Sequence, residues 1–371
     1  MSKMSKKNNK ISNGVNNLDN QKVYKKLDTN RVAKSIELLP AQMKQVLEDV
    51  SLIKVPLEHR NIKQVVVNGM GGSIINFRLV KAALSDQIKL PITLTSGYQV
   101  PASVDKNTLY LLSSYSGNTE EVLSVYKEVK KRSAKVLAIC EQGNNKLADL
   151  MKKENIPGYM FKAEFNPSNQ PRLGLGYAIL GAIMLFSKVG LISLKEKELK
   201  NIISKLELTD QALRPDKSVK INKAKQIAIK LYGHMPIIVA AEFLSGNLNI
   251  LRNQFNETSK NFSSFLELPD LNHYALESLV NPKSNKNNLM FLFFDSLLYH
   301  PRIQKRAFLT KQVAKKNKIK FLEYKISGAT KLEQALKMMQ FGCWLTYYLA
   351  MLNNINPVKI PWVDWFKKEL K

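Results

Sequence analysis

Short β-branched or apolar runs alternate with stretches of helical periodicity along most of this chain, and few folds accommodate such an alternation. Each run is long enough for one strand, and the stretches between several of them are long enough for a helix. The runs are KQVVVNG, PITLTS, TLYLLSS, AKVLAIC and GYMF in the first half, and PIIVAAE, FSSFLEL, NLMFLFFD and IKFLEYKI in the second. This order predicts an α/β fold in which parallel strands are flanked by helices.

A polar, lysine-rich helical stretch from about residue 195 to residue 230 separates the two series of runs. The simplest architecture is therefore two successive units. One spans residues 31–194 and includes a helical lead-in, and the other spans residues 195–371 and ends in the helical segment WVDWFKKELK. We expect residues 1–30, which are polar and basic, to form a disordered tail. Periodicity alone leaves one continuous sheet open as an alternative.

The chain is strongly basic. Its 57 Lys and Arg residues outnumber its 30 Asp and Glu residues, which gives a formal net charge of +27 and a surface that should attract anions. The lysines are spread over the whole sequence, and no zinc-finger or helix-turn-helix spacing stands out, so nucleic acid is an unfavoured partner.

Cys140 and Cys343 lie in apolar runs without a CxxC pair. They indicate reduced core thiols in a cytoplasmic protein, and neither looks like a metal ligand.

Neither the N-terminal residues nor the most apolar segment predicts a secreted or membrane protein. The N-terminal residues MSKMSKKNNK are not followed by the apolar core of a secretory signal. The longest uncharged apolar run, at residues 173–187, contains 15 residues. Because a helix needs about 20 apolar residues to cross a bilayer, this run predicts a buried helix instead.

Residues 113–121, SSYSGNTEE, place hydroxyl groups between a predicted strand and a predicted helix. The first amides of a helix have no partners and its dipole is positive there, so hydroxyls at this point favour an anion such as phosphate. The alternative is an ordinary cap by Ser116 or Asn118, with two glutamates complementing the dipole. Taken alone, the segment favours the cap.

A second segment of the same type favours an anion site over an ordinary helix cap. GMGGS, residues 69–73, also follows a predicted strand, and its glycines let the backbone approach a ligand closely. The glycine spacing differs from the GxGxxG dinucleotide fingerprint. Both segments leave the carboxyl ends of strands in the same predicted sheet, which is where open α/β sheets bind ligands.

At this point the sequence resembles a known family. GMGGS, SYSGNTEE and QPRLGLGY (residues 170–177) are similar to the three signatures of the sugar isomerase (SIS) domain in bifunctional phosphoglucose/phosphomannose isomerases. FNETSK (residues 255–260), the pair NH (residues 272 and 273) and the tail NPVKIPWVDWFKKEL resemble later segments of that family. The resemblance runs from about residue 60 to the end. It implies two doubly wound SIS-type subdomains and a C-terminal helix.

The resemblance implies a set of site residues. Those that would hold the phosphoryl group of a sugar phosphate are Gly71, Gly72, Ser73, Ser114, Ser116 and Thr119. Those that would act on the sugar are Arg172, Glu257, His273 and Lys367. Arg172 would stabilise an enediolate, and Glu257 would move a proton between C1 and C2.

His273 would help to open the sugar ring, and the family supplies it from the neighbouring subunit, which implies a homodimer. Lys367 would assist ring opening, although Lys368 is adjacent and could take its place. The family commonly has NHNE where this chain has NHYALE, so Tyr274 and Ala275 replace a polar pair. We expect this replacement to change the choice of substrate or the rate, and to leave the catalytic mechanism itself in place.

The sequence therefore predicts an aldose–ketose isomerase that interconverts glucose 6-phosphate, and mannose 6-phosphate as a further substrate, with fructose 6-phosphate. The mechanism implied by the resemblance needs no metal or other cofactor. Two alternatives stay open, namely a non-catalytic phosphosugar sensor and another SIS isomerase that acts on amino-sugar or heptose phosphates. A sensor that regulates transcription would normally carry a DNA-binding domain, and the residues before the first strand lack that pattern.

Overall fold

The computed structural model describes residues 17–370, and these residues form two parallel β-sheets. The first sheet has the order β2-β1-β3-β4-β5 and the second has the order β7-β6-β8-β9. The strands of the first are β1 (Gln64–Gly69), β2 (Ile92–Thr95), β3 (Thr108–Ser113), β4 (Lys135–Glu141) and β5 (Gly158–Phe161), and those of the second are β6 (Met235–Ala241), β7 (Ser264–Leu268), β8 (Leu289–Ser296) and β9 (Lys320–Ile326). The predicted fold class is confirmed, and each of the predicted apolar runs forms one of these strands.

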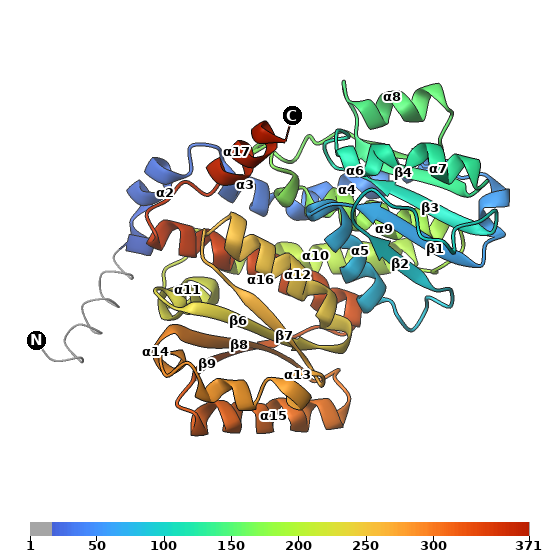
Figure 1. Ribbon diagram of the computed structural model, residues 1–371. Helices are drawn as coiled ribbons and strands as arrows, with labels where there is room; N and C mark the ends of the chain where they lie inside the picture. The colour runs from blue at the N-terminus through green and yellow to red at the C-terminus, as the bar shows by residue number, and fades with distance from the viewer. Residues whose placement is uncertain (1–16, 371) are drawn as a thin grey trace, which may run out of the picture.

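Helices cover both faces of each sheet (Figure 1). The first half of the chain contains α2 (Gln21–Leu27), α3 (Val32–Glu37), α4 (Leu39–Glu48), α5 (Gly72–Ala83), α6 (Glu120–Ser124), α7 (Tyr126–Lys131), α8 (Lys146–Lys153) and α9 (Leu175–Lys188). The second half contains α10 (Glu196–Leu213), α11 (Lys223–Leu231), α12 (Ser245–Glu257), α13 (Leu271–Tyr274), α14 (Asn285–Asn288), α15 (Pro301–Lys316), α16 (Lys331–Leu352) and α17 (Pro361–Glu369). Short 3₁₀ turns are η1 (Asp49–Leu52), η2 (Leu57–Arg60), η3 (Pro171–Leu173), η4 (Glu242–Leu244) and η5 (Glu277–Val280).

The alternation of side chains along β1 explains why both faces of the first sheet are buried. Val66 belongs to an apolar cluster that α6, α7 and α8 complete on one face, whereas Val65 and Val67 belong to the larger cluster on the other face. A strand that is apolar on both faces is typical of a parallel sheet with helices on each side.

The larger apolar cluster continues from the first sheet into the second. It passes through α5, α9, α12 and α16, so the two units share one core instead of meeting at a polar surface. Gly246 of α12 permits this closeness, because a Cβ there would lie 2.4 Å from the backbone oxygen of Arg78 in α5. Consequently the second unit has a fixed position relative to the first, and residues from both can build one site.

The expectation of a disordered tail over residues 1–30 is wrong for residues 17–30. Leu18 and the α2 residues Tyr24 and Leu27 are buried, and the ring of Tyr24 stacks on Tyr347 of α16. Buried apolar contacts of this kind offset the conformational entropy that is lost when a segment becomes ordered. Residues 1–16 lie outside the described residues.

The boundary expected between residues 194 and 195 falls just before α10. In the sequence, α10 follows the last strand of the first sheet and precedes the first strand of the second.

The predicted buried helix over the apolar run is α9, and its side chains from Leu175 to Phe186 are mostly buried. Among the described residues, no helix is long and apolar enough to cross a membrane. Cys140 and Cys343 are both free and buried, as predicted from their apolar neighbours.

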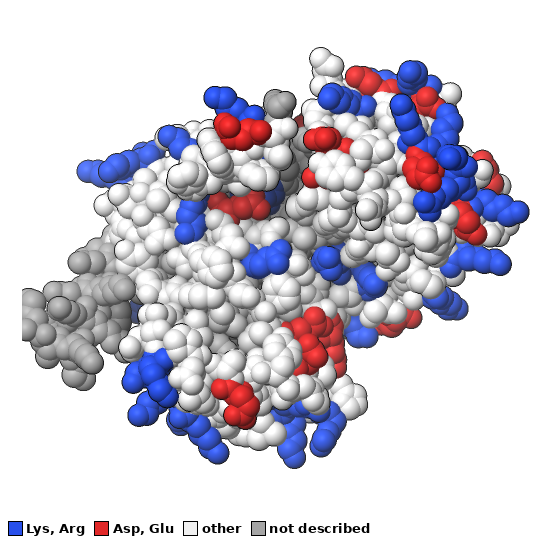
Figure 2. Space-filling model, viewed as in Figure 1, with Lys and Arg blue, Asp and Glu red and all other residues white. Residues whose placement is uncertain are grey.

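The charged side chains are distributed broadly over the face shown in Figure 2. Lysines and arginines appear at the upper, right and lower edges of the described residues with acidic residues among them, and they do not gather into a single stripe. The described residues on this face therefore form no continuous basic track of the kind that follows a nucleic-acid backbone.

Candidate active site

The two segments that the sequence analysis paired meet at the carboxyl edge of the first sheet. β1 and β3 are neighbours, with Gly69 opposite Ser113 at their ends. The strand order reverses between them, because β2 lies beyond β1 and β4 lies beyond β3. Ligands bind to open α/β sheets at such a switch point, outside the carboxyl ends of the strands.

Hydrogen bonds join the two segments directly. The Ser113 hydroxyl donates to the Ser73 carbonyl oxygen at 2.9 Å, and the Ser73 hydroxyl accepts from the Tyr115 backbone N–H at 2.9 Å. Ser114 and Thr119 share a hydrogen bond of 2.6 Å between their hydroxyls. Ser73, Ser114 and Thr119 are thus brought to one edge of the sheet, with Ser116 exposed in the same turn.

The backbone of these segments leaves room for a ligand. Gly71 precedes α5 with a φ of +50°, which favours glycine, and an added Cβ at Gly71 or Gly72 would meet nothing within 4 Å. Gly117 has a φ of +66° and lies against the side chain of Asn145. The open space at the first turn of α5, whose amides are positive, is suited to an anion.

A third segment packs against the SSYSGNT turn and carries Arg172. The Asn166 side chain donates to the Tyr115 hydroxyl at 3.0 Å and to the Gln170 carbonyl oxygen at 3.0 Å. Gly174 touches the Tyr115 ring so closely that a Cβ there would lie 2.1 Å from it. Tyr115 therefore fixes η3, and Arg172 with it, beside the two hydroxyl-bearing turns.

Arg172 is held almost entirely inside the protein, with only 10% of its side chain exposed. Its guanidinium donates to the Gln170 side chain at 2.9 Å and to the carbonyl oxygens of Pro357 at 3.0 Å and Val358 at 2.8 Å. The buried Nε–H has no hydrogen-bond partner among the described residues. Burial lowers the pKa of Arg172, while the charges of Glu257 and Asp364 raise it. An unused donor on a fixed cation can serve a bound anion.

Glu257 is the last residue of α12, and its carboxylate lies 3.9 Å from Arg172 Nη1. The Gln254 side chain, one turn earlier, donates to the Arg172 carbonyl oxygen at 2.9 Å and ties the two elements together. Burial raises the pKa of Glu257, and the charges of Arg172, Lys367 and Lys260 oppose that rise. About a third of the side chain stays exposed, so the carboxylate can reach a ligand.

The C-terminal helix α17 lies over this pair. The charge of Lys367 acts on Glu257, and that of Asp364, one turn earlier, acts on Arg172. Sequence reasoning missed Lys260, which follows α12 and whose pKa is lowered to about 8 by burial and by the charge of Arg172. Only its place inside FNETSK hinted at a role.

His273 is not brought to Glu257 within one chain. It lies on α13, which packs with α15 on the face of the second sheet opposite α12 (Figure 1). The preceding strand β7 meets the start of α12, where the Ser245 hydroxyl donates to Glu267. Glu257 is at the other end of that 13-residue helix, about 18 Å away. His273 and Tyr274 are both exposed.

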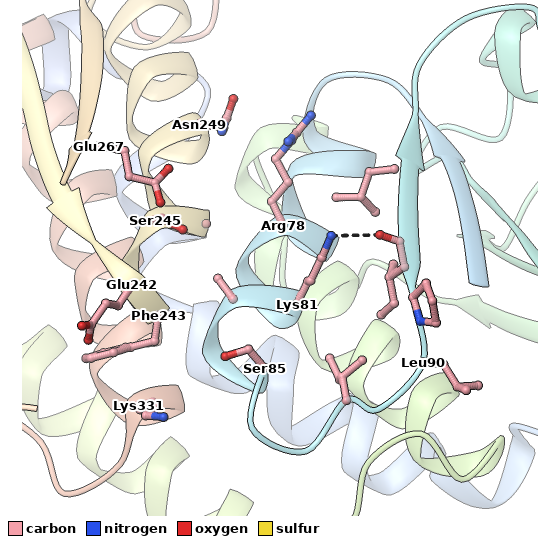
Figure 3. Close-up of a pocket in the computed structure, with 16 residues that line it drawn as sticks. Arg78, Lys81, Ser85, Leu90, Glu242, Phe243, Ser245, Asn249, Glu267 and Lys331 are labelled. Carbon is pink, nitrogen blue, oxygen red and sulfur yellow. Dashed lines mark hydrogen bonds between the residues drawn. The ribbon is translucent and has the colours of Figure 1, made fainter. Parts of the chain in front are cut away.

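A separate groove of about 880 Å³ lies between α5 and the start of α12. Figure 3 shows Arg78 and Lys81 on one wall and Glu242, Ser245 and Glu267 on the other. Its lining residues include none of the predicted site residues. The candidate active site is therefore placed by the turns and the Arg172–Glu257 pair, not by the size of a cavity.

Comparisons with known proteins identify the family models and the solved structures that this chain resembles. Residues 220–370 match the family model of the bacterial phospho-glucose isomerase C-terminal SIS domain, and residues 94–154 match that of the SIS domain. Among solved structures, a hypothetical protein of Thermus thermophilus is similar with a TM-score of 0.72 at 14% identity, covering 99% of this chain and 95% of that one. A glucose-6-phosphate isomerase-like protein of the same organism has a TM-score of 0.58 at 17% identity, covering 95% and 98%.

Curated relatives extend the likeness from the fold to the family. The bifunctional phosphoglucose/phosphomannose isomerase of Caldicellulosiruptor bescii is 30% identical over 91% of this chain and 98% of its own length. The protein of that name from Aquifex aeolicus is 29% identical over 83% of this chain and 91% of its own length. The chain therefore belongs to the bifunctional phosphoglucose/phosphomannose isomerase family.

Proposed function

We propose that this protein is an aldose–ketose isomerase that interconverts glucose 6-phosphate and mannose 6-phosphate with fructose 6-phosphate. The observation that carries the proposal is the Arg172–Glu257 pair, a carboxylate 3.9 Å from a buried cation beside two hydroxyl-bearing turns. The names of the curated relatives support an enzyme over a non-catalytic phosphosugar sensor.

The phosphoryl group would be held at the carboxyl edge of the first sheet. The residues proposed to bind it are Gly71, Gly72, Ser73, Ser114, Ser116 and Thr119. Hydroxyls and backbone amides suit this task, because they donate hydrogen bonds to phosphate oxygens and the start of α5 adds a positive dipole. With the phosphate fixed there, the carbon chain of the open sugar would extend toward Arg172 and Glu257.

Glu257 is proposed as the base. Its carboxylate takes the proton from C2 of the open-chain aldose, the electron pair forms the C1–C2 double bond, and the C1 carbonyl oxygen becomes the enediolate oxygen. Protonation of that oxygen, loss of the C2 hydroxyl proton and delivery of a proton from the Glu257 carboxyl group to C1 complete the ketose. A raised pKa supports this role, because a stronger base removes a carbon-bound proton more readily.

Arg172 is proposed to stabilise the enediolate. Its Nε–H has no partner among the described residues, and the surrounding carbonyl oxygens hold the guanidinium rigidly. A cation that is already in place when charge develops lowers the barrier without reorganisation. Lys367, whose charge reaches Glu257 from α17, is proposed to assist ring opening.

His273 is proposed to complete ring opening from a second copy of the chain, which makes a homodimer necessary for full activity. Its exposure on α13, far from Glu257 in the same chain, supports that arrangement. The buried free cysteines fit a reducing compartment, and we propose that the enzyme acts in the cytoplasm.

The test is an assay of the purified protein against hexose 6-phosphates, amino-sugar phosphates and heptose phosphates. We expect isomerisation of glucose and mannose 6-phosphates, and loss of turnover in Glu257→Gln, with sugar phosphate affinity nearly unchanged. Glu196→Gln, at an exposed glutamate of α10, is the matched control and should keep the wild-type rate. Isomerisation of an amino-sugar or heptose phosphate alone would replace the proposed substrate, and an active Glu257→Gln variant would remove Glu257 from the base role.

A further inference from the structure

Lys260 lies in an unusual local structure directly after α12. Its φ of +51° is in the left-handed region, which a lysine enters only at a cost. In this conformation the ammonium group of Lys260 donates a hydrogen bond to the carbonyl oxygen of Asn356, near the C-terminal end of the chain, at 3.0 Å. Backbone strain combined with a long-range hydrogen bond indicates that the surrounding structure holds this side chain in place.

The residues that Lys260 contacts belong to a strap, which we define as residues 356–358. The strap joins α16 to α17 and accepts hydrogen bonds from two cations. Lys260 binds Asn356, while Arg172 binds Pro357 and Val358. The Asn353 side chain, just before the strap, donates to the Ser259 carbonyl oxygen at 2.9 Å. The loop after Glu257 and the segment that leads to Lys367 are therefore tied at several points.

The charged groups around Glu257 come from three elements. Arg172 faces it from η3, Lys367 from α17 and Lys260 from the loop that follows α12, and an acid of α17, Asp364, acts on Arg172. Of the three cations, Arg172 is hydrogen-bonded to the strap, and Lys367 lies on a helix whose residues are exposed. Lys260 is the cation that is both close to Glu257 in the chain and bound to the strap.

We propose that Lys260 is a positioning residue of the isomerase site: its ammonium ties the strap to the end of α12, and its positive charge favours the ionised form of Glu257. The role rests on the proposed function, because it acts through the proposed base. Lys260 takes no proton from the sugar. Its charge favours the carboxylate over the neutral acid, and its hydrogen bond to the strap helps to hold Arg172 and α17 at a fixed position relative to Glu257.

This role has a direct physical consequence for the titration of Glu257. Burial raises the pKa of its carboxyl group, and Lys260 is one of the cations that counteract the rise. Removing the ammonium should therefore raise the Glu257 pKa further, so that the base becomes ionised only at a higher pH. Lys260 itself has a pKa lowered to about 8, so its own charge should be lost at a lower pH than that of an ordinary lysine.

The experiment compares Lys260→Met and Lys260→Arg with Lys318→Met. Lys318 is a matched control, because it is also a lysine with left-handed φ (+59°) just after a helix, and it is exposed on the far side of the second sheet. The first readout is a ¹³C NMR titration of the Glu257 carboxylate, assigned by its absence in Glu257→Gln. The second readout is the pH profile of kcat in each variant.

We expect Lys260→Met to raise the Glu257 pKa and to move the acid limb of kcat upward by the same amount, with Lys260→Arg and Lys318→Met staying near the wild type. A Glu257 titration that is identical in Lys260→Met and in the wild type would overturn the proposal. Because the NMR titration needs no substrate, it still decides on Lys260 if the wild type isomerises no hexose phosphate, an outcome that would overturn only the proposed function.

Discussion

Arg172 Nη1 and Glu257 Oε2 lie 3.9 Å apart, although one residue belongs to the first α/β unit and the other to the second. Their approach depends on α12, which packs against α5 of the first unit and reaches η3 with its C-terminal end. The candidate active site is therefore a product of the shared core. Neither unit alone would hold a carboxylate, a buried guanidinium and the two hydroxyl-bearing turns in one place.

Replacing Arg172 should separate binding of the sugar from stabilisation of the enediolate. We expect Arg172→Met to lower kcat by about 10²- to 10³-fold, because loss of one preorganised donor to a developing oxyanion has effects of that size. Arg172→Lys should recover little of the rate, since a lysine cannot reproduce several fixed donors. Steady-state kinetics with glucose 6-phosphate give the measurement, and a kcat left close to the wild-type value would contradict the assignment.

The pH profile should report the raised pKa of Glu257. A base must be deprotonated to act, so kcat should fall as pH decreases through the pKa of that carboxyl group. Because burial raises this pKa, the acid limb should lie above the ordinary glutamate value of about 4.3. A profile of kcat from mildly acidic to neutral pH measures it. A rate that stays constant down to the ordinary glutamate value would contradict the role of Glu257.

Thr119 offers a test of the phosphate site that leaves the acid–base residues in place. Its hydroxyl is paired with that of Ser114 at 2.6 Å, directly before α6. Thr119→Val removes a donor for a charged oxygen, so KM for the sugar phosphate should rise about 10-fold or more with a smaller change in kcat. Inorganic phosphate should lose inhibitory affinity in parallel. Thr209→Val on α10 is the control, and equal effects in both variants would contradict a phosphate contact.

The proximity of the two hydroxyl-bearing turns was predictable from the sequence. Parallel strands end at the same edge of a sheet, so GMGGS and SSYSGNT had to lie near each other once both preceding runs were recognised as strands. The two preceding strands, β1 and β3, contain the apolar runs VVV and LYLL, which are visible in the local sequence. The positions of the two hydroxyl-bearing turns therefore follow from short-range features of the chain.

The Arg172–Glu257 pair and the role of Lys260 could not be predicted in the same way. Both depend on how α12 packs against the first unit and on where the strap at residues 356–358 runs, and such long-range packing leaves no periodic signal. Lys260 is one of many lysines in the chain, and no sequence pattern predicts its left-handed backbone conformation. The order of residues 17–30 was missed for a related reason, because Tyr24 is stabilised by Tyr347 from the far end of the chain.

The proposed homodimer can be tested by mixing two inactive variants. Glu257→Gln lacks the base and His273→Ala lacks the ring-opening imidazole, so a mixed dimer would contain one intact site built from the remaining residues of both copies. Unfolding and refolding the two together should recover about a quarter of the wild-type rate with a cyclic substrate. Each variant refolded alone is the control. A mixture no more active than the separate variants would place both residues in the same chain's site.

The central claim is that Glu257 carries a proton between C2 and C1. Incubation of fructose 6-phosphate in D₂O, followed by NMR of the aldose formed, measures it most directly. The account predicts that the wild type introduces deuterium at C2, because the carboxyl group of Glu257 exchanges its proton with solvent during the lifetime of the enediolate. Glu257→Gln should introduce none. Undiminished deuterium uptake in Glu257→Gln would contradict the account.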